Sequence, residues 1–217
     1  MNSAVSPDAP SSSAPSDSLG PQYFNGFYQG GADPWGFETR WYEARKRAIT
    51  VASLPRQRVS SAFEPGCAIG VLTEELAQRC DRLLATDISD VPLTVARQRL
   101  SGRSGVVVEQ RRVPQDWPTG PFDLIVLSEI GYYCDPADLS LLIAAAVSSL
   151  TEDGVLLACH WRHPVADYPM TGDLVHEMLR RESGLSVLVE HTEEDFRLDV
   201  LVPAPAASVA RRDGLLA

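Results

Sequence analysis

The sequence lacks the features that mark membrane, secreted and nucleic-acid-binding proteins. Its 217 residues contain no uninterrupted apolar run of membrane length, and the N-terminal stretch has neither the basic start nor the apolar segment of a secretory signal. Lysine and arginine total 19 against 29 acidic residues, a formal net charge of −10, which disfavours binding to a phosphate backbone. We therefore expect a soluble, cytoplasmic protein with small-molecule partners, no nucleic acid and no membrane contact.

Cysteines are few as well, and none of them form a C-x-x-C pair. A chain of this length can build a core without disulfides, so Cys67, Cys80, Cys134 and Cys159 are predicted to be buried thiols. A metal site from Cys159, His160 and His163 is disfavoured, because adjacent side chains in a strand point apart. We predict no metal site.

Composition divides the chain into one domain with flanking segments. Residues 1–20 are dominated by Ser, Pro, Ala and Asp, and we predict a disordered tail there. Residues 21–57 form an N-terminal aromatic segment and a helix over about 38–53, residues 58–205 the main domain, and residues 206–217 a C-terminal tail. The aromatic segment either packs against the sheet edge or acts as a lid in which Tyr23 or Trp35 closes over a cofactor.

A glycine-rich turn organises the main domain. The stretch Phe63-Glu64-Pro65-Gly66-Cys67-Ala68-Ile69-Gly70 follows a β-branched apolar run and precedes helical spacing, which is the strand, turn and helix of a nucleotide site. The helix N-terminus offers free N–H groups to a ligand. A second strand ends in Asp87, roughly twenty residues beyond the turn, where a carboxylate can bind ribose hydroxyls. Position alone leaves the cofactor open.

Two details of the turn narrow the choice of cofactor. The middle glycine of the dinucleotide motif is absent, and Glu64 would repel a pyrophosphate but suits the ammonium and sulfonium of S-adenosylmethionine. The pair Tyr42-x-x-x-Lys46 looks like that of short-chain dehydrogenases, but it precedes the turn and we discount it. A nicotinamide-dependent oxidoreductase remains the less favoured alternative.

Alternating strands and helices predict an α/β fold with a doubly wound, Rossmann-like, mostly parallel sheet. We expect strands over 82–88, 106–113, 122–128 and 155–161, and helices over 90–100 and 136–150. Residues 185–190 and 196–202 are predicted to pair as a C-terminal antiparallel hairpin.

The motifs Glu64-x-Gly66-x-x-x-Gly70, Asp87 and Phe122 to Glu129 resemble those of class I S-adenosylmethionine-dependent methyltransferases. A closer resemblance, to the nodulation protein S-like branch, adds Asp33-Pro34-Trp35 and Arg112-Val113-Pro114. It implies a seven-stranded sheet with one reversed strand and S-adenosyl-L-methionine as cofactor. The implied cofactor contacts are Trp35, Glu64, Gly66, Cys67, Gly70, Asp87, Ile88, Arg112, Val113 and Ser128, and Asp116 is a candidate for a displaced acid near the adenine.

The segment after the fourth strand bears on the acceptor. Ser128-Glu129-Ile130-Gly131-Tyr132-Tyr133 replaces the segment that holds a flipped base in nucleic-acid methyltransferases, which argues against base methylation. Glu129, His160 and His163 are the candidate catalytic bases, and Tyr132, Tyr133 and Arg162 the candidate acceptor contacts.

The resemblance also bears on the reaction. It implies N-methylation of an amine on a small-molecule or glycan-like acceptor. Alternatives are O-methylation of a hydroxylated metabolite, or cofactor binding without catalysis. The sequence leaves the choice of base and the oligomeric state open.

Overall fold

The computed structural model describes residues 17–216, so the predicted tail lies largely outside the described residues. Its last residues are in contact with the domain, since the Leu19 N–H donates to the Tyr133 carbonyl at 2.9 Å. Ser18 Oγ lies 2.6 Å from an Asp138 carboxylate oxygen. At the other end a short helix, α7 (Val209–Arg212), forms within the predicted C-terminal tail.

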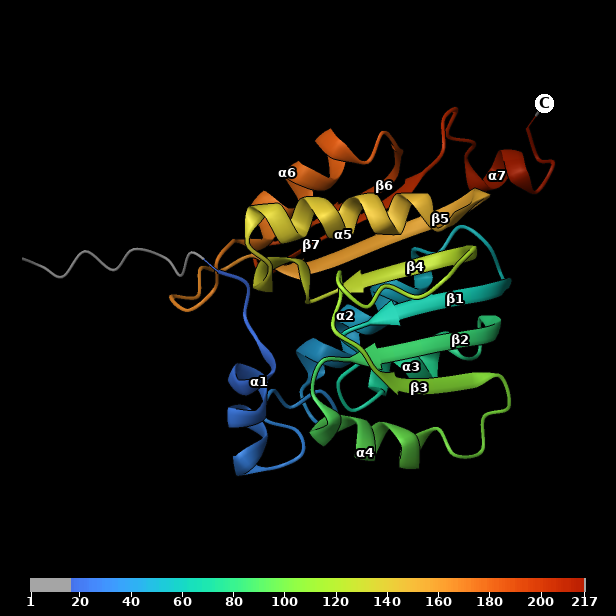
Figure 1. The fold of residues 1–217 in the computed structure, drawn as a ribbon. Coiled ribbons are helices and arrows are strands. Elements are labelled where there is room, and N and C mark those ends of the chain that lie inside the picture. The colour runs from blue at the N-terminus through green and yellow to red at the C-terminus, as the bar shows by residue number, and fades with distance from the viewer. Residues whose placement is uncertain (1–16, 217) are drawn as a thin grey trace, which may run out of the picture.

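Seven strands form one sheet in the order β3-β2-β1-β4-β5-β7-β6 (Figure 1). The pairs are parallel except for those of β7, which runs antiparallel to both β5 and β6. The predicted mostly parallel, Rossmann-like sheet with a C-terminal hairpin is confirmed. The strands are β1 (Val59–Pro65), β2 (Cys80–Asp87), β3 (Val106–Gln110), β4 (Phe122–Ser128), β5 (Leu150–Trp161), β6 (Ser186–Thr192) and β7 (Phe196–Val202).

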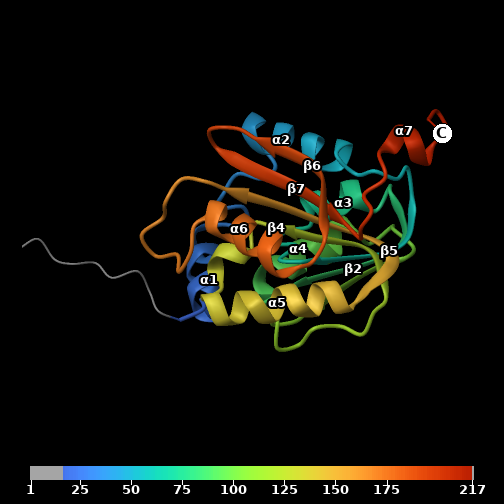
Figure 2. The same cartoon turned by 90° about the horizontal axis from the view of Figure 1, so that it is seen from above.

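Helices cover both faces of the sheet, with α5 on the face opposite α2 and α3 (Figure 2). The helices are α1 (Pro21–Phe27), α2 (Trp41–Ala52), α3 (Val71–Leu76), α4 (Asp90–Arg99), α5 (Pro136–Ser148) and α6 (Gly172–Glu182), with short 3-10 turns η1 (Tyr28–Gly30) and η2 (Gly131–Tyr133). Residues 172–182, for which we predicted no element, begin as a helix where the Thr171 side chain accepts from the Leu174 N–H.

Strand β4 shows why the central strands are apolar at nearly every position. Its side chains alternate between two buried clusters: Ile125 and Leu127 pack with α5, whereas Leu124 and Val126 pack with α3. A sheet covered on both faces has no solvated side, so a parallel strand within it needs a continuous hydrophobic run.

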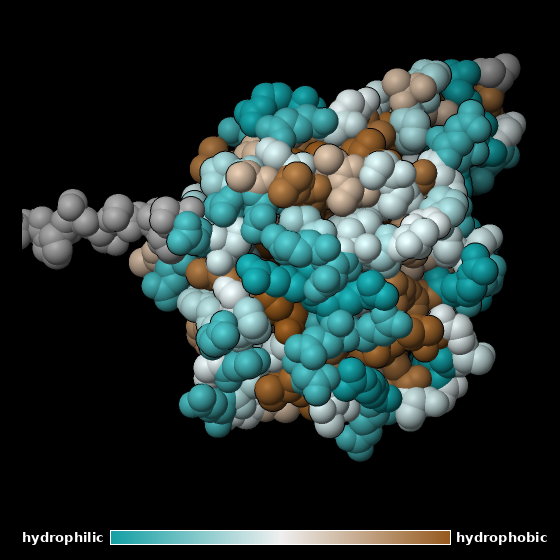
Figure 3. Space-filling model, in the orientation of Figure 1, coloured by the Kyte–Doolittle hydropathy of each residue, from teal (hydrophilic) through white to brown (hydrophobic). Residues whose placement is uncertain are grey.

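The arrowheads of the first four strands point toward α1, which lies beside their carboxyl ends (Figure 1). Loops after those strands and the N-terminal helices therefore meet at one edge of the sheet. The surface seen from the α5 side is mainly hydrophilic, with separate hydrophobic patches (Figure 3). Within residues 17–216, no helix has the length and apolar character needed to cross a membrane.

Candidate active site

A cavity of about 520 Å³ opens where the loops after the strands meet α1 and α2. Its size is in the range of small-molecule sites, and the carboxyl edge of a doubly wound sheet is where such sites form. The lining includes Phe24, Tyr28, Trp35, Phe37, Arg40, Tyr42, Glu43, Lys46, Gly66, Ala68, Asp87, Ile88, Arg111, Arg112, Val113, Glu129, Ile130, Tyr132, Tyr133, Trp161 and Tyr168.

The turn between β1 and α3 contributes one face of the cavity. Gly66 has a φ of 76°, and a Cβ there would lie 2.1 Å from Ile130 Cγ2, so a larger residue does not fit. Gly66 and Ala68 line the cavity. Cys67 and Gly70 are not part of the lining. Cys67 is buried, and Gly70, at the start of α3, packs against Ala96 of α4.

Asp87, the last residue of β2, ties this turn to the neighbouring strand. Its Oδ2 accepts from the Ala68 N–H at 3.0 Å and its Oδ1 from the Ser89 N–H at 2.9 Å. Burial raises the pKa of Asp87 to about 6. Each carboxylate oxygen keeps acceptor capacity, so Asp87 and the adjacent Ile88 can face a ligand with hydroxyl groups.

Glu64 lies beneath the turn and is only 3% exposed, outside the cavity lining. Its Oε2 atom has no hydrogen-bond partner among residues 17–216, and burial raises the pKa of this carboxyl to about 7. A buried acid without a partner is costly in its charged form. A cationic group bound next to this carboxyl would favour its charged form.

The segment after β3 forms a third part of the lining. The strand ends at Gln110, three residues before the predicted end, so Arg111, Arg112 and Val113 belong to a loop that faces the cavity. Asp116 lies outside the lining, and its Oδ2 accepts from the Arg112 N–H at 3.3 Å. It holds this loop and does not face the cavity.

Glu129 is the central polar group of the part of the cavity wall that does not belong to the glycine turn. Its Oε1 lies 2.7 Å from Lys46 Nζ, and its Oε2 accepts from the Trp161 N–H at 3.1 Å and from the Tyr132 hydroxyl. Glu129 has a φ of 58°, which non-glycine residues rarely adopt, and its N–H donates to the Cys159 carbonyl. These contacts fix the carboxylate at the cavity wall.

Helix α2 brings Tyr42, Glu43 and Lys46 to this carboxylate. Lys46 Nζ lies 3.1 Å from Glu43 Oε2 and 5.0 Å from the centroid of the Tyr42 ring. Burial lowers the pKa of Lys46, but the nearby carboxylates of Glu129 and Glu43 outweigh this effect and hold the pKa above its ordinary value. The Tyr42 hydroxyl is buried without a hydrogen-bond partner in the described part of the chain.

Aromatic rings form much of the remaining wall. Trp35 contacts Phe27, Tyr28 and Phe37, with ring centroids 5.4 to 5.7 Å apart. Around the acceptor candidates, the Tyr132 ring stacks on Tyr168 with centroids 4.9 Å apart, and the Tyr133 ring meets Phe24 edge to face at 4.8 Å. The aromatic residues that line the cavity are Phe24, Tyr28, Trp35, Phe37, Tyr42, Tyr132, Tyr133, Trp161 and Tyr168. Trp35 of the N-terminal segment thus lines the cavity, whereas Tyr23 lies outside the lining.

Besides Glu64, Cys67 and Gly70, four further predicted site residues lie outside the lining. His160 is completely buried, and both of its ring nitrogens are hydrogen bonded. His163 is exposed and lies 2.8 Å from Asp195 Oδ1, and Arg162 forms a two-pronged ion pair with Asp173. Ser128 is paired in the sheet opposite Cys159. Of the candidate bases, only Glu129 faces the cavity.

The cysteines are all buried free thiols. Among residues 17–216, no three His, Cys, Asp or Glu side chains are grouped to hold a metal ion.

Sequence reasoning missed Lys46, Glu43 and Tyr42. A signal was present, since Tyr42-x-x-x-Lys46 places both residues on one helix face. The pair precedes the glycine turn, but chain order does not decide which helix reaches a cavity.

The sheet order, the glycine turn and the acid at the end of β2 together define the fold of class I methyltransferases. The family profile of nodulation protein S (NodS) matches residues 29–168. The chain therefore belongs to the nodulation protein S family, and the family and fold predicted from the sequence are confirmed.

Curated relatives and solved structures agree with this assignment. Nodulation protein S of Bradyrhizobium diazoefficiens is 35% identical over 132 residues, covering 58% of this chain and 61% of that protein. The protein of Rhizobium tropici is 30% identical over 127 residues, covering 58% of this chain and 53% of that protein. The chain thus spans a little over half the length of these relatives.

Among solved structures, a putative methyltransferase from Pseudomonas syringae is 48% identical, with a TM-score of 0.68, over 75% of this chain and 99% of that one. The N-methyltransferase NodS from Bradyrhizobium japonicum, in complex with S-adenosyl-L-homocysteine, has a TM-score of 0.76 over 85% of this chain and 98% of that one. At 24% identity the second match speaks for the fold alone.

Proposed function

We propose that this protein is an S-adenosylmethionine-dependent methyltransferase that methylates an amine on a small-molecule or glycan-like acceptor. One observation carries the proposal: a single cavity joins the Gly66 turn and Asp87 to Glu129 and Lys46. A cofactor held at the first pair therefore faces an acceptor held at the second. Membership of the nodulation protein S family supports the same reaction.

The residues around the glycine turn fit this cofactor. Glu64 lies outside the cavity lining, but a cationic group at the turn would give its unpartnered buried oxygen a partner, and Asp87 retains acceptor sites for ribose hydroxyls. Ile88 and Val113 offer apolar contacts to an aromatic base, and Trp35 lines the cavity. When bound, S-adenosylmethionine supplies an already activated methyl group, so the protein's task is alignment and exclusion of water.

Glu129 is the residue best placed to receive the proton of an amine. A carboxylate has about four acceptor sites, and Lys46, Tyr132 and the Trp161 N–H occupy three of those of Glu129. One site is left, which suffices to orient an ammonium N–H and take its proton. The aromatic wall adds cation–π attraction for a positively charged group.

The same contacts favour N-methylation over O-methylation. A hydroxyl must lose its proton as it is methylated and needs a stronger base than an amine, which attacks with a free lone pair. Glu129 is engaged by an ammonium and two further donors, and His160 is out of reach of the cavity. O-methylation would need a base that the lining does not offer in an uncommitted form.

The test combines cofactor binding with an acceptor screen. Calorimetry with S-adenosyl-L-homocysteine should show binding by the wild type, loss of at least about tenfold in affinity for Asp87→Ala, and no change for Asp90→Ala. Asp90 is a matched control, because it is an exposed acid three residues along the chain that pairs with Arg97.

Amino sugars, simple amines and hydroxylated metabolites are then screened by mass spectrometry for the gain of one methyl group. Methylated amines are expected. Methylated hydroxyls beside untouched amines would overturn the N-methylation proposal. Preferential binding of NADH would point to an oxidoreductase, and cofactor binding without turnover over the whole panel would point to a non-catalytic protein.

A further inference from the structure

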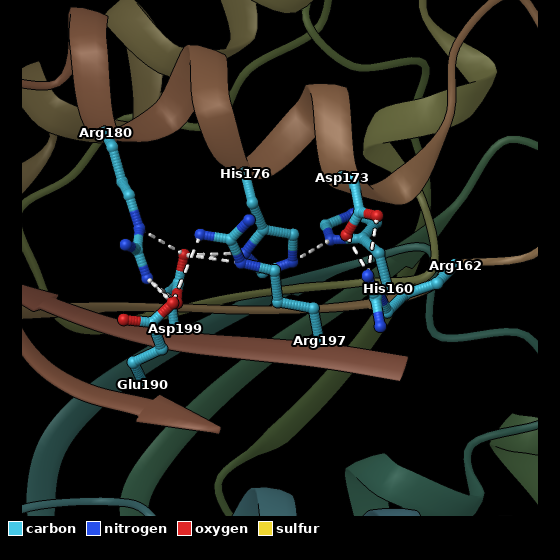
Figure 4. A network of polar contacts seen from close by, with 8 residues as sticks. All are labelled: His160, Arg162, Asp173, His176, Arg180, Glu190, Arg197 and Asp199. Atoms are coloured by element: carbon cyan, nitrogen blue, oxygen red, sulfur yellow. Dashed lines mark hydrogen bonds and ion pairs between the residues drawn. The ribbon is translucent and has the colours of Figure 1, made fainter. Parts of the chain in front are cut away.

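Three buried side chains form a hydrogen-bonded chain that links β7, α6 and β5 (Figure 4). Asp199 of β7, His176 of α6 and His160 of β5 are all 0% exposed. His176 Nδ1 lies 2.8 Å from Asp199 Oδ2, and His160 Nδ1 lies 3.2 Å from His176 Nε2. At its far end, His160 Nε2 accepts from the Gly131 N–H at 3.0 Å.

The partners at the two ends of the chain fix the position of every proton in it. Burial raises the pKa of Asp199, but hydrogen bonds from His176 and Arg180 outweigh this effect and hold the pKa at about 2. Asp199 is therefore ionised and can only accept hydrogen bonds. His176 must then carry its proton on Nδ1 and accept at Nε2, which requires a proton on His160 Nδ1. This leaves a lone pair on His160 Nε2 for the Gly131 N–H. A proton added to either ring would set two donors against each other.

The end point of this chain lies in the loop that supplies the polar groups of the cavity. Gly131 stands between Glu129 and Tyr132. A Cβ at Gly131 would lie 2.5 Å from Val175 Cγ1 and 3.0 Å from His160 Nε2, so the loop lies directly on α6 and His160. Glu129, with its positive φ, keeps this conformation only because its surroundings hold it.

We propose that His160, aligned by His176 and Asp199, is a positioning residue that fixes the loop 129–133 and thereby the Glu129 carboxylate and Tyr132 hydroxyl. His160 acts through the Gly131 backbone, because its side chain is outside the cavity lining. This role replaces that of a general base, which we expected from the sequence. Its effect on turnover rests on the proposed function, whereas its effect on the loop does not.

Four groups face His160, and together with burial they favour its neutral form, although Asp199 by itself favours the charged one. They are His176 on α6, Asp199 on β7, Lys46 on α2 and the Tyr132 ring, whose centroid lies 5.4 Å away. Burial, together with the neighbouring His176 and Lys46, holds the pKa of His160 well below its ordinary value. The acceptor for the Gly131 N–H is thus retained at neutral pH.

The first test needs no variant and no substrate. Nitrogen-15 NMR of the wild type, whose four histidines include the partly exposed His163 and His191, should show His160 as the Nδ1–H tautomer from pH 6 to 8. An Nε2–H tautomer, or a protonated His160 in this range, would overturn the proposal.

The second test compares His160→Phe, which removes both hydrogen bonds, with His160→Gln, whose side-chain oxygen can accept from Gly131. Hydrogen exchange over residues 129–133 should rise at least about tenfold in the first variant and be largely restored in the second, while β4 stays protected. His163→Phe is the exposed control and should change neither the exchange over residues 129–133 nor the protection of β4. Unaltered exchange at Gly131 in folded His160→Phe would refute the positioning role.

Turnover gives the third readout. We expect kcat of His160→Phe to fall about tenfold to a hundredfold, with the affinity for S-adenosyl-L-homocysteine within twofold of wild type. Equal loss of cofactor affinity and kcat would show a general structural defect instead. If His160→Phe does not fold, the tautomer and the His160→Gln exchange decide the question. If no acceptor is methylated by the wild type, the proposed function fails while the first two tests still stand.

Discussion

Lys46 Nζ lies 2.7 Å from Glu129 Oε1, which joins helix α2 to the first residue after β4. The two residues are 83 positions apart in the sequence. The contact is mostly shielded from water, since the side chain of Lys46 is 7% exposed and that of Glu129 19%. The N-terminal segment is thus part of the site through a specific ion pair as well as through its aromatic residues.

Replacing Lys46 with Met should destabilise the fold by about 3–5 kcal/mol, because it leaves Glu129 and the nearby Glu43 as neighbouring buried acids without their cation. Urea unfolding gives the value. Adding Glu129→Gln should recover part of the loss in a double-mutant cycle. Arg97→Met, which breaks the exposed pair with Asp90, is the control and should cost less than about 1 kcal/mol. Equal losses in Lys46→Met and Arg97→Met would contradict a buried pair.

Gly66→Ala should cost about 1–3 kcal/mol and weaken cofactor binding. The new Cβ meets Ile130 Cγ2 at 2.1 Å, and a φ of 76° is strained for alanine. Trimming the neighbour in Gly66→Ala/Ile130→Ala relieves the clash but not the backbone strain. Gly26→Ala, on α1 with open space around it, serves as the matched control and should be neutral or slightly stabilising. A Gly66→Ala protein as stable as Gly26→Ala would refute this account.

The fold was largely predictable, because local patterns carry it. The continuous apolar run of β4 gave its bounds to the residue, and the hairpin of β6 and β7 followed from two short runs with a polar connection. The predicted end of β3 at Val113 was wrong: the apolar run stops at Val108, the strand ends at Gln110, and Val113 turns to the cavity. Helix α6 was overlooked although its apolar side chains recur with helical spacing.

The predicted residues that line the cavity include those whose positions the backbone sets. Gly66 and Asp87 occupy positions fixed by the turn and the strand end, and both line the cavity. His160 and Arg162 were chosen by residue type, and the structure commits them to a buried hydrogen-bond chain and to Asp173. Lys46 reaches Glu129 through tertiary packing, which no local pattern reports.

Glu64→Gln should stabilise the ligand-free protein at pH 8 and have little effect near pH 5. Burial raises the pKa of Glu64 from 4.5 to about 7, so the folded state holds its proton more tightly than the unfolded state. The resulting penalty is fully present above pH 7 and is relieved as the pH falls from 7 toward 4.5. It amounts to at most about 3 kcal/mol, which thermal or urea unfolding at the two pH values can resolve. A destabilised Glu64→Gln at pH 8 would contradict an uncompensated charge.

The same acid should make cofactor affinity depend on pH. A ligand ammonium favours the carboxylate of Glu64, so binding below pH 7 must release a proton, and the affinity for S-adenosyl-L-homocysteine should fall about tenfold from pH 8 to pH 6. Asp87, whose pKa burial raises to about 6, adds to this only near pH 6 and below. Calorimetry in two buffers of different ionisation enthalpy measures both affinity and proton release. Glu64→Gln should bind weakly at pH 8 and lose most of the pH dependence, whereas Glu129→Gln should retain it. A wild-type affinity that is constant from pH 6 to 8 would show that Glu64 does not meet the ligand's positive charge.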